Sequence, residues 1–94
     1  MRVRWLQVAL ANLEAAADYI AEDNPSAASR FVQEVFRTTG LLARNPAMGR
    51  PGRVPGTREL VIPNTPYILP YRARANSLEV LRVFHAARKW PTRF

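Results

Sequence analysis

The sequence predicts an α+β fold in which an antiparallel hairpin of two helices packs on a mostly antiparallel four-stranded sheet. Two observations lead to this prediction. Apolar residues recur at helical spacing in the first half of the chain, and the second half holds three apolar runs bounded by Pro, Gly, Asn or Ser. The expected order is strand, helix, helix, strand, strand, strand. With 94 residues, we expect a single domain spanning 1–94.

A short strand and a first helix are expected at the N-terminus. Arg2–Leu6 alternates arginine with apolar side chains, which favours a strand. From about Val8 to Glu22 the apolar spacing predicts a helix. Its expected buried residues are Leu6, Leu10, Leu13, Ala17 and Ile20. Glu14, Asp18 and Glu22 recur every fourth residue, either as a solvated helix face or as a contact for a basic patch elsewhere.

The second helix is expected to begin directly after the first. Asn24 can cap the new helix, and Pro25 suits its first position. The helix should run to about Arg44, with a buried stripe of Ala28, Phe31, Val32, Val35, Thr39 and Leu42. So tight a connection predicts an antiparallel hairpin, one face of which covers the sheet.

Three strands are expected in the second half, at Arg58–Ile62, Tyr67–Ala73 and Leu78–His85. They follow Asn45–Gly56, which is either a plain linker or a basic loop at the rim of a binding surface. The last run is apolar on both sides and should be a central strand. Alternation sorts it into Leu78, Val80, Arg82 and Phe84 on one face and Glu79, Leu81, Val83 and His85 on the other. Pro70 cannot donate a backbone hydrogen bond, so a bulge or an outward-facing position is expected there.

Positive charge is concentrated in the second half. The chain has 14 Lys and Arg against 7 Asp and Glu, a net charge of +7. Residues 1–34 hold three basic and five acidic side chains, which is a net −2, and residues 35–94 hold eleven and two, which is a net +9. Such a surface attracts nucleic acid or an acidic protein.

Composition excludes several classes of site. There is no cysteine, so a disulfide framework and a thiolate metal site are excluded, which suits a reducing cytosol. No apolar run approaches the length of a membrane span, and the N-terminus is too short and too charged to be a signal peptide. We therefore expect a cytoplasmic protein with no metal, no other cofactor and no membrane contact.

Four blocks resemble the ParE/RelE toxin superfamily of bacterial type II toxin–antitoxin systems. In order they are LEAAADYIAEDNPSAASRF, NPAMGRPGRVPGTREL, PYILPYR and LEVLRVFHAARKWP, and together they span nearly the whole chain. The resemblance implies a toxin that forms a hetero-oligomer with a small acidic antitoxin of the ParD or RelB type. The cations expected to meet the antitoxin are Arg50, Arg53, Arg58, Arg72 and Arg74.

The superfamily holds two activities. ParE-like members poison DNA gyrase by protein–protein contact, whereas RelE-like members cleave messenger RNA in the ribosomal A site without a metal. An endoribonuclease needs a general base, cations for the phosphorane and an acid for the leaving oxygen. The candidates here are His85, Arg58 and Arg82, because His85 is the single histidine and its ordinary pKa suits acid–base work. Alternatively, His85 is a strand-end imidazole that bonds a neighbouring backbone group or Glu79.

The departures from the RelE-like pattern favour the ParE-like activity, for which no catalytic residue is expected. RelE-like enzymes carry an arginine inside a Tyr-Arg-Leu-Val-Tyr run on the middle strand. The matching run here is Tyr67–Tyr71, and Ile68 occupies the place of the arginine. Isoleucine cannot stabilise a phosphorane.

The C-terminal tail, His85–Phe94, pairs cations with large apolar groups. Arginine and tryptophan are favoured interface anchors, so the expected target-binding residues are Arg88, Lys89, Trp90 and Arg93. Alternatively, Trp90 folds back onto the sheet and covers its core.

A third interpretation is a simple nucleic-acid-binding module with a cationic, aromatic sheet. Against it, Tyr67 and Tyr71 share a strand face with Leu69 and Ala73, which favours a core position over a stacking platform.

Overall fold

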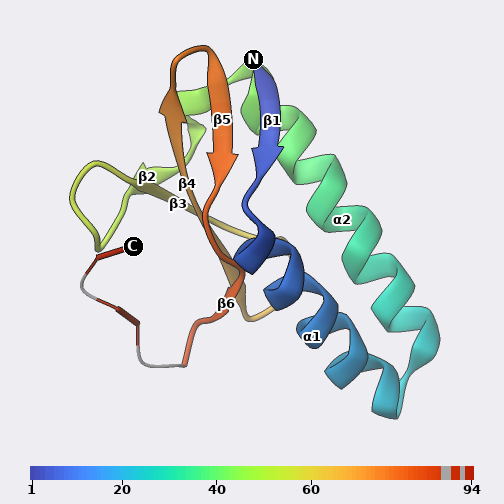
Figure 1. Cartoon of the computed structure of the whole chain (residues 1–94). Helices are drawn as coiled ribbons and strands as arrows, with labels where there is room; N and C mark the ends of the chain where they lie inside the picture. The colour runs from blue at the N-terminus through green and yellow to red at the C-terminus, as the bar shows by residue number, and fades with distance from the viewer. Residues whose placement is uncertain (88–89, 92) are drawn as a thin grey trace.

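Two helices cover one face of a sheet in the computed structural model of the chain, which describes residues 1–87, 90–91 and 93–94 (Figure 1). The elements are β1 (Arg2–Trp5), α1 (Gln7–Asp23), α2 (Pro25–Arg44), the 3-10 helix η1 (Pro46–Met48), β2 (Arg50–Pro51), β3 (Arg58–Val61), β4 (Tyr67–Arg74), β5 (Ser77–Val80) and β6 (Phe84–His85). The predicted α+β class and order are confirmed. The two-residue strand β2 is added to the expected four-stranded sheet, and β6 is the end of the predicted last strand.

Asn24 forms the junction of the helical hairpin. Its backbone N–H donates to the Ile20 carbonyl at 3.0 Å and closes α1, and its side-chain oxygen accepts from the Ala27 N–H at 3.1 Å and caps α2. Pro25 occupies the first turn, as predicted. One residue therefore ends one helix and begins the next. Neither helix is long and apolar enough to cross a membrane, and no other helix among the described residues is either.

The buried stripe of α2 is confirmed, but that of α1 was partly wrong. Ala28, Phe31, Val35, Thr39 and Leu42 are buried, and Val32 is half-buried. In α1 the buried residues are Ala9, Leu13 and Ala16, whereas Leu10 is 44% exposed. Each residue advances a helix by about 100°, so a stripe through Ala9 turns Leu10 toward solvent. Leu6, Ala17 and Ile20 lie at the edge of the core and are half-buried.

The sheet has the order β1-β5-β4-β3-β2, and β6 pairs with β4. All described pairings are antiparallel except that of β1 with β5, which is parallel. Its register sets Arg2 beside Ser77 and Arg4 beside Glu79. This pairing therefore places the N-terminal arginines beside the cationic strands formed by the second half of the chain.

The predicted last strand, Leu78–His85, is interrupted at Pro70. On β4, Tyr71 pairs with Val80 and Ile68 pairs with Phe84, so two residues of β4 face three residues, Leu81–Val83. The Pro70 carbonyl accepts from the Leu81 N–H at 3.0 Å, but proline offers no N–H on that side. The bulge expected near Pro70 is therefore present, in the facing chain, and the prediction of one continuous strand was wrong.

The extra residue of the bulge reverses which side chains face the helices. Val83 joins the core under α1, and His85 lies edge-on against Tyr67, whereas Phe84 points to the opposite face with Trp90. The predicted faces are therefore correct up to Leu81 and wrong beyond it.

Side chains satisfy the backbone groups that the bulge removes from the ladder. The Val83 N–H donates to Oδ1 of Asn12 on α1 at 3.2 Å, and Nη1 of Arg82 donates to the Leu81 carbonyl at 2.6 Å. Buried backbone groups without partners are costly, so these two bonds let the chain leave β4 and return to it.

Replacing Asn12 by alanine should lower the free energy of unfolding by about 1–3 kcal/mol, because it leaves the buried Val83 N–H without an acceptor. Urea unfolding measures the change. Gln33→Ala, at an exposed position of α2, is the control and should stay within about 0.5 kcal/mol of the parent. Equal stability of the two variants would contradict the role given to Asn12.

Candidate functional site

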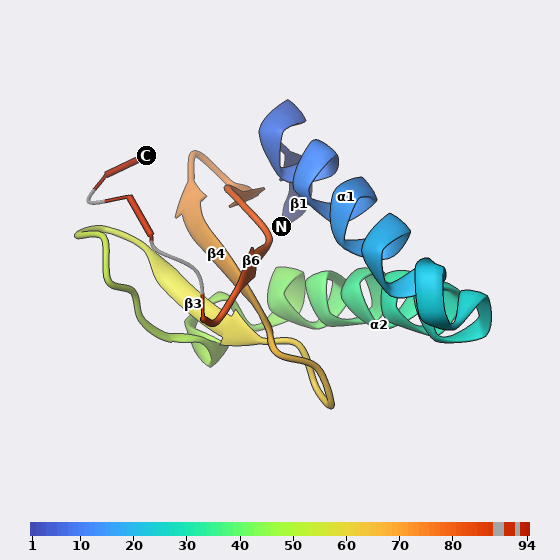
Figure 2. The same ribbon diagram turned by 90° about the horizontal axis from the view of Figure 1, so that it is seen from below.

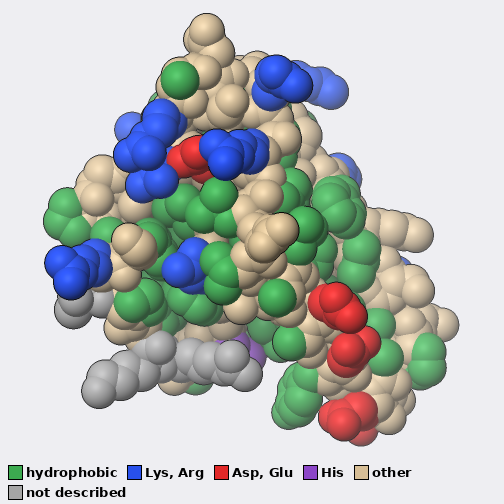
Figure 3. Space-filling model, viewed as in Figure 1, with side chains coloured by type: hydrophobic (Ala, Val, Ile, Leu, Met, Phe, Trp, Pro, Cys, Tyr) green, Lys and Arg blue, Asp and Glu red, His purple; other side chains and the backbone are tan. Residues whose placement is uncertain are grey.

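The sheet face that the helices leave uncovered, called the outer face below, carries two buried carboxylates surrounded by arginines. The carboxylates are Glu59 on β3 and Glu79 on β5, at 3% and 5% exposure. Figure 3 shows basic side chains on either side of an acidic one over β4, β5 and β1. Acidic side chains also gather over α1, where Glu14, Asp18 and Glu22 are exposed. Their exposure fits the interpretation of a solvated helix face.

Glu79 is the centre of an arginine cluster formed by Arg4, Arg72 and Arg74, and Arg2 lies on the same face of β1 as Arg4. Its Oε1 accepts from Nε of Arg72 at 2.7 Å, and its Oε2 accepts from Nη1 of Arg4 at 3.3 Å. The hydrogen bond from Arg72 lowers the pKa of the Glu79 carboxyl, and the charges of Arg72, Arg74 and Arg4 act in the same direction against its burial. Three cations surround one carboxylate, so the cluster keeps a positive charge that can attract an anionic partner.

Sequence reasoning assigned Arg72 and Arg74 to a binding surface but missed Arg2 and Arg4. Their alternation with Val3 showed that both share one strand face. The parallel pairing of β1 with β5, which brings that face beside Glu79, joins residues more than 70 positions apart and has no local signal in the sequence.

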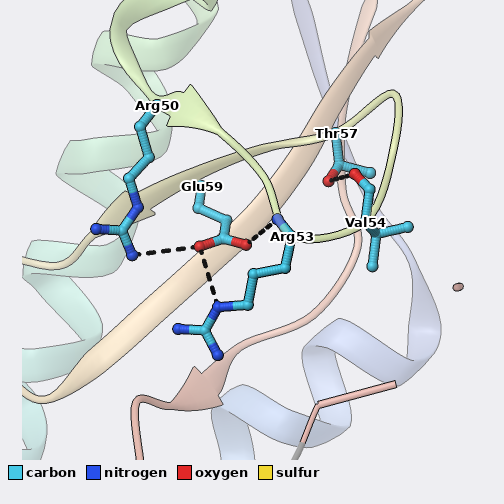
Figure 4. Close-up of polar contacts among 5 residues, drawn as sticks. All are labelled: Arg50, Arg53, Val54, Thr57 and Glu59. Carbon is cyan, nitrogen blue, oxygen red and sulfur yellow. Dashed lines mark hydrogen bonds and ion pairs between the residues drawn. The ribbon is translucent and has the colours of Figure 1, made fainter. Parts of the chain in front are cut away.

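Glu59 holds the loop between β2 and β3 against the outer face (Figure 4). Its Oε2 accepts from the Arg53 backbone N–H at 2.7 Å, and its Oε1 lies 3.3 Å from Nη2 of Arg50 and 3.7 Å from Nε of Arg53. The loop is closed by the Gly52 N–H donating to the Thr57 carbonyl at 2.8 Å. The segment is therefore a basic loop at the rim of the outer face.

Arg58 lies apart from the other predicted antitoxin-binding cations, on the helix side of the sheet. It is opposite Tyr71 and donates from Nη1 to the Gly49 carbonyl at 2.8 Å. The Tyr71 hydroxyl accepts from the Gly49 N–H at 2.8 Å and donates to the Pro46 carbonyl at 2.7 Å. Arg58 and Tyr71 thus fasten the segment that follows α2 to the sheet.

An aromatic cluster of Phe84, Trp90 and Phe94 covers part of the outer face. The Trp90 ring lies 4.8 Å from that of Phe84, which lies 6.3 Å from that of Phe94. Arg53 sits over the Trp90 ring, and Arg82 over the Phe94 ring, at 3.8 and 5.1 Å. Figure 2 shows the C-terminal segment on the side of the sheet away from the helices.

Two of the predicted target-binding residues, Trp90 and Arg93, lie in or beside this cluster. Trp90 is half-buried. It therefore folds back onto the sheet, as the alternative interpretation of the tail proposed, and keeps part of its side chain at the surface. Arg93 is exposed. Arg88 and Lys89 lie outside the described residues.

The three catalytic candidates for RNA cleavage are not brought together. His85 pairs with Tyr67 and Arg58 with Tyr71, four residues along β4, which is about 13 Å of strand. His85 and Arg58 face the helices, whereas Arg82 bonds the Leu81 carbonyl and sits over Phe94.

The environment of His85 fits the structural interpretation of this residue. Its Nδ1 accepts from the Ala87 N–H at 3.1 Å, which is the neighbouring backbone bond that was expected; Glu79 lies on the other face. His85 also lines a groove of about 590 Å³ between α1, α2 and the β3–β4 connection, with Ile20, Phe31 and Tyr67 among its apolar walls. No group of three or more metal-binding side chains gathers within residues 1–87, 90–91 and 93–94.

Comparison with known proteins identifies the family. The family model described as the ParE toxin of the type II toxin–antitoxin system parDE matches residues 3–90. The chain belongs to this ParE toxin family. The resemblance predicted from the four sequence blocks is therefore confirmed at family level.

Individual relatives of this ParE-family toxin cover nearly its whole length. The Y4kP protein of Sinorhizobium fredii, named as a candidate toxin, is 46% identical over 90 residues, which are 96% of this chain and 93% of that protein. Toxin RelE2 of Caulobacter vibrioides is 33% identical over 87 residues, which are 93% and 97%. A solved structure of the chromosomal ParDE TA system from P. aeruginosa superposes with a TM-score of 0.80 at 31% identity and covers 90% of this chain and 95% of that one.

The lowered pKa of Glu79 predicts a pH-dependent contribution to the stability of this ParE-family fold. A carboxyl whose folded-state pKa lies below its ordinary 4.5 stabilises the fold above that value and loses the effect as the pH falls through the folded-state pKa. Glu79→Gln should therefore be less stable than the parent near pH 7 and approach it near pH 3, as measured by urea unfolding.

The control for this pH dependence is Glu14→Gln, which removes an exposed carboxylate of α1 that makes no ion pair among the described residues. A solvated carboxylate contributes little to the fold, so the stability of this variant should follow the parent at both pH values. If Glu79→Gln is less stable than the parent by the same amount at neutral and acid pH, the ion-pair account is contradicted.

Proposed function

We propose that this ParE-family toxin arrests growth by binding DNA gyrase and blocking replication, and that a cognate acidic antitoxin neutralises it. The observation that carries the proposal is the separation of His85, Arg58 and Arg82, which gives the fold a cationic binding face without an assembled acid–base site. Such a toxin is a single domain, acts in the cytoplasm where its target lies, and is not an enzyme.

The target-binding surface in this proposal is the tail with its cations Arg88, Lys89 and Arg93 and its anchor Trp90. A half-exposed tryptophan beside arginines has the composition of an interface hot spot. Phe84 packs against Trp90, so the indole ring is held on the sheet instead of extending freely into solvent.

The antitoxin-binding surface in this proposal combines the outer-face arginines with the apolar groove. Arg50, Arg53 and Arg74 are exposed and Arg72 is half-buried, and the carboxylates beside them do not balance their charge. The groove walls offer burial for the apolar face of a helix. An acidic segment that is disordered alone and folds on the toxin could use both, giving a hetero-oligomer. Arg58, engaged beneath Gly49, is the weakest member of the predicted set.

A ribosome-dependent endoribonuclease is the second candidate function, favoured by the similarity to Toxin RelE2 and by the position of His85 at a groove. It would require His85, Arg58 and Arg82 to act on one phosphate. However, His85 and Arg58 lie on the helix side of the sheet, whereas Arg82 lies on the outer face.

Growth arrest on induction of toxin variants separates the two functions. Proton transfer by a positioned side chain is worth about 10²–10⁴-fold in rate, so His85→Gln should abolish an endoribonuclease but leave a gyrase poison toxic. Truncating the anchor in Arg88→Ala/Trp90→Ala should weaken target binding by about thirtyfold or more and relieve the arrest.

Two controls accompany this experiment. Neutralisation by the co-expressed antitoxin shows that each variant still folds. Phe36→Ala removes an exposed aromatic residue on α2 that packs against Trp5 and does not line the groove, and it should remain toxic. If His85→Gln became harmless while still binding antitoxin, and the tail variant stayed toxic, the gyrase proposal would fail and the endoribonuclease would replace it.

A further inference from the structure

We propose that Arg53 is a positioning residue that holds Trp90 on the outer face by linking the indole ring to the buried carboxylate of Glu59. The placement of Trp90 is a property of this fold, and its consequence for target binding rests on the proposed function. Arg53 lies 37 positions before Trp90 in the sequence, in a different loop.

The base of the Arg53 side chain is fixed by its own backbone. Its N–H donates to Oε2 of Glu59 at 2.7 Å, and Glu59 is itself held in the central part of the sheet by the pairing of β3 with β4. The adjoining turn is closed by Gly52 and Thr57, whose hydroxyl also donates to the Val54 carbonyl at 2.6 Å (Figure 4). The Arg53 side chain therefore extends from a fixed backbone position on a closed loop.

The guanidinium makes two contacts of different kinds at once. Its Nε lies 3.7 Å from Oε1 of Glu59, and its central carbon lies 3.8 Å from the centroid of the Trp90 ring. A planar guanidinium can direct an N–H edge at a carboxylate while its flat face covers an aromatic ring. An ammonium group offers charge but no such plane, so lysine should reproduce only part of the arrangement.

Little else among the described residues gives the Trp90 ring a direction. Its indole Nε1 is buried and has no hydrogen-bond partner within the part of the chain that the structure describes. Its other ring contact is Phe84, edge-on at 4.8 Å and 61°, which restrains the tilt between the two rings. Arg53 adds the charged contact on the face of the indole, and that contact ties the position of the ring to Glu59.

The matched comparison is between Arg53 and Arg50. Both pair with Oε1 of Glu59, but Arg50 has no ring contact among the described residues. Arg53→Gln and Arg50→Gln thus remove the same charge from the same carboxylate, and only the first removes the contact with Trp90. Both are made in a Trp5→Phe background, so that Trp90 is the single tryptophan.

Quenching of Trp90 fluorescence by acrylamide measures how firmly the ring is held. The loss of a cation–π contact should shift the equilibrium away from the held position by about 2- to 30-fold, so Arg53→Gln should show a redder emission and stronger quenching than the Trp5→Phe parent. Arg50→Gln should match the parent, and Arg53→Lys should fall between them. Circular dichroism confirms that each variant folds.

The result that overturns the proposal is quenching of Arg53→Gln equal to that of the parent, or an equal increase in Arg53→Gln and Arg50→Gln. The second pattern would assign the effect to Glu59 rather than to the ring contact. Gyrase inhibition by Arg53→Gln and Arg53→Lys is then compared with that of the parent. If the parent inhibits gyrase, inhibition should fall in the same order as Trp90 is released. If the parent does not inhibit gyrase but the quenching differs as stated, the proposed function fails and the positioning role of Arg53 stands.

Discussion

The missing backbone hydrogen of Pro70 is the constraint on which the arrangement of this molecule depends. On the side of β4 where a second N–H would extend the ladder, Pro70 offers only its carbonyl, and the facing chain inserts an extra residue before it pairs again as β6. Because side chains alternate along a strand, that residue turns Val83 and His85 toward the helices and Phe84 toward the outer face. The bulge thereby removes the single histidine from the cationic face and provides the ring on which Trp90 rests.

The two buried carboxylates give the basic half of the chain its organisation. Glu59 and Glu79 are the only acidic residues after residue 34, and each is buried among arginines on the outer face. Ion pairs of this kind add modestly to stability, because burial of the charge offsets much of the attraction. Their larger effect is to fix the directions of Arg53 and Arg72, so that a surface with excess positive charge presents its cations in a defined pattern.

Local patterns in the sequence predicted the elements, and contacts between distant residues decided the site. The caps at Asn24 and Pro25, the α2 stripe and the disturbance at Pro70 all follow from neighbouring residues. The parallel partner of β1, the exact register beyond Leu81 and the attachment of Arg53 to both Glu59 and Trp90 depend on which strands and loops meet in space. Burial of Tyr67 and Tyr71 on the helix side, which alternation did predict, leaves no pair of tyrosines on the outer face as a base-stacking platform.

The central claim is that the outer face and tail of this ParE-family toxin act by binding rather than by catalysis. The most direct measurement is to add the purified toxin, with and without its antitoxin, to DNA gyrase acting on plasmid and, in parallel, to translating ribosomes with messenger RNA. The account predicts that gyrase is inhibited, that the antitoxin relieves the inhibition, and that the messenger RNA stays intact. Cleavage of the messenger RNA on ribosomes, with plasmid supercoiling unaffected, would contradict it.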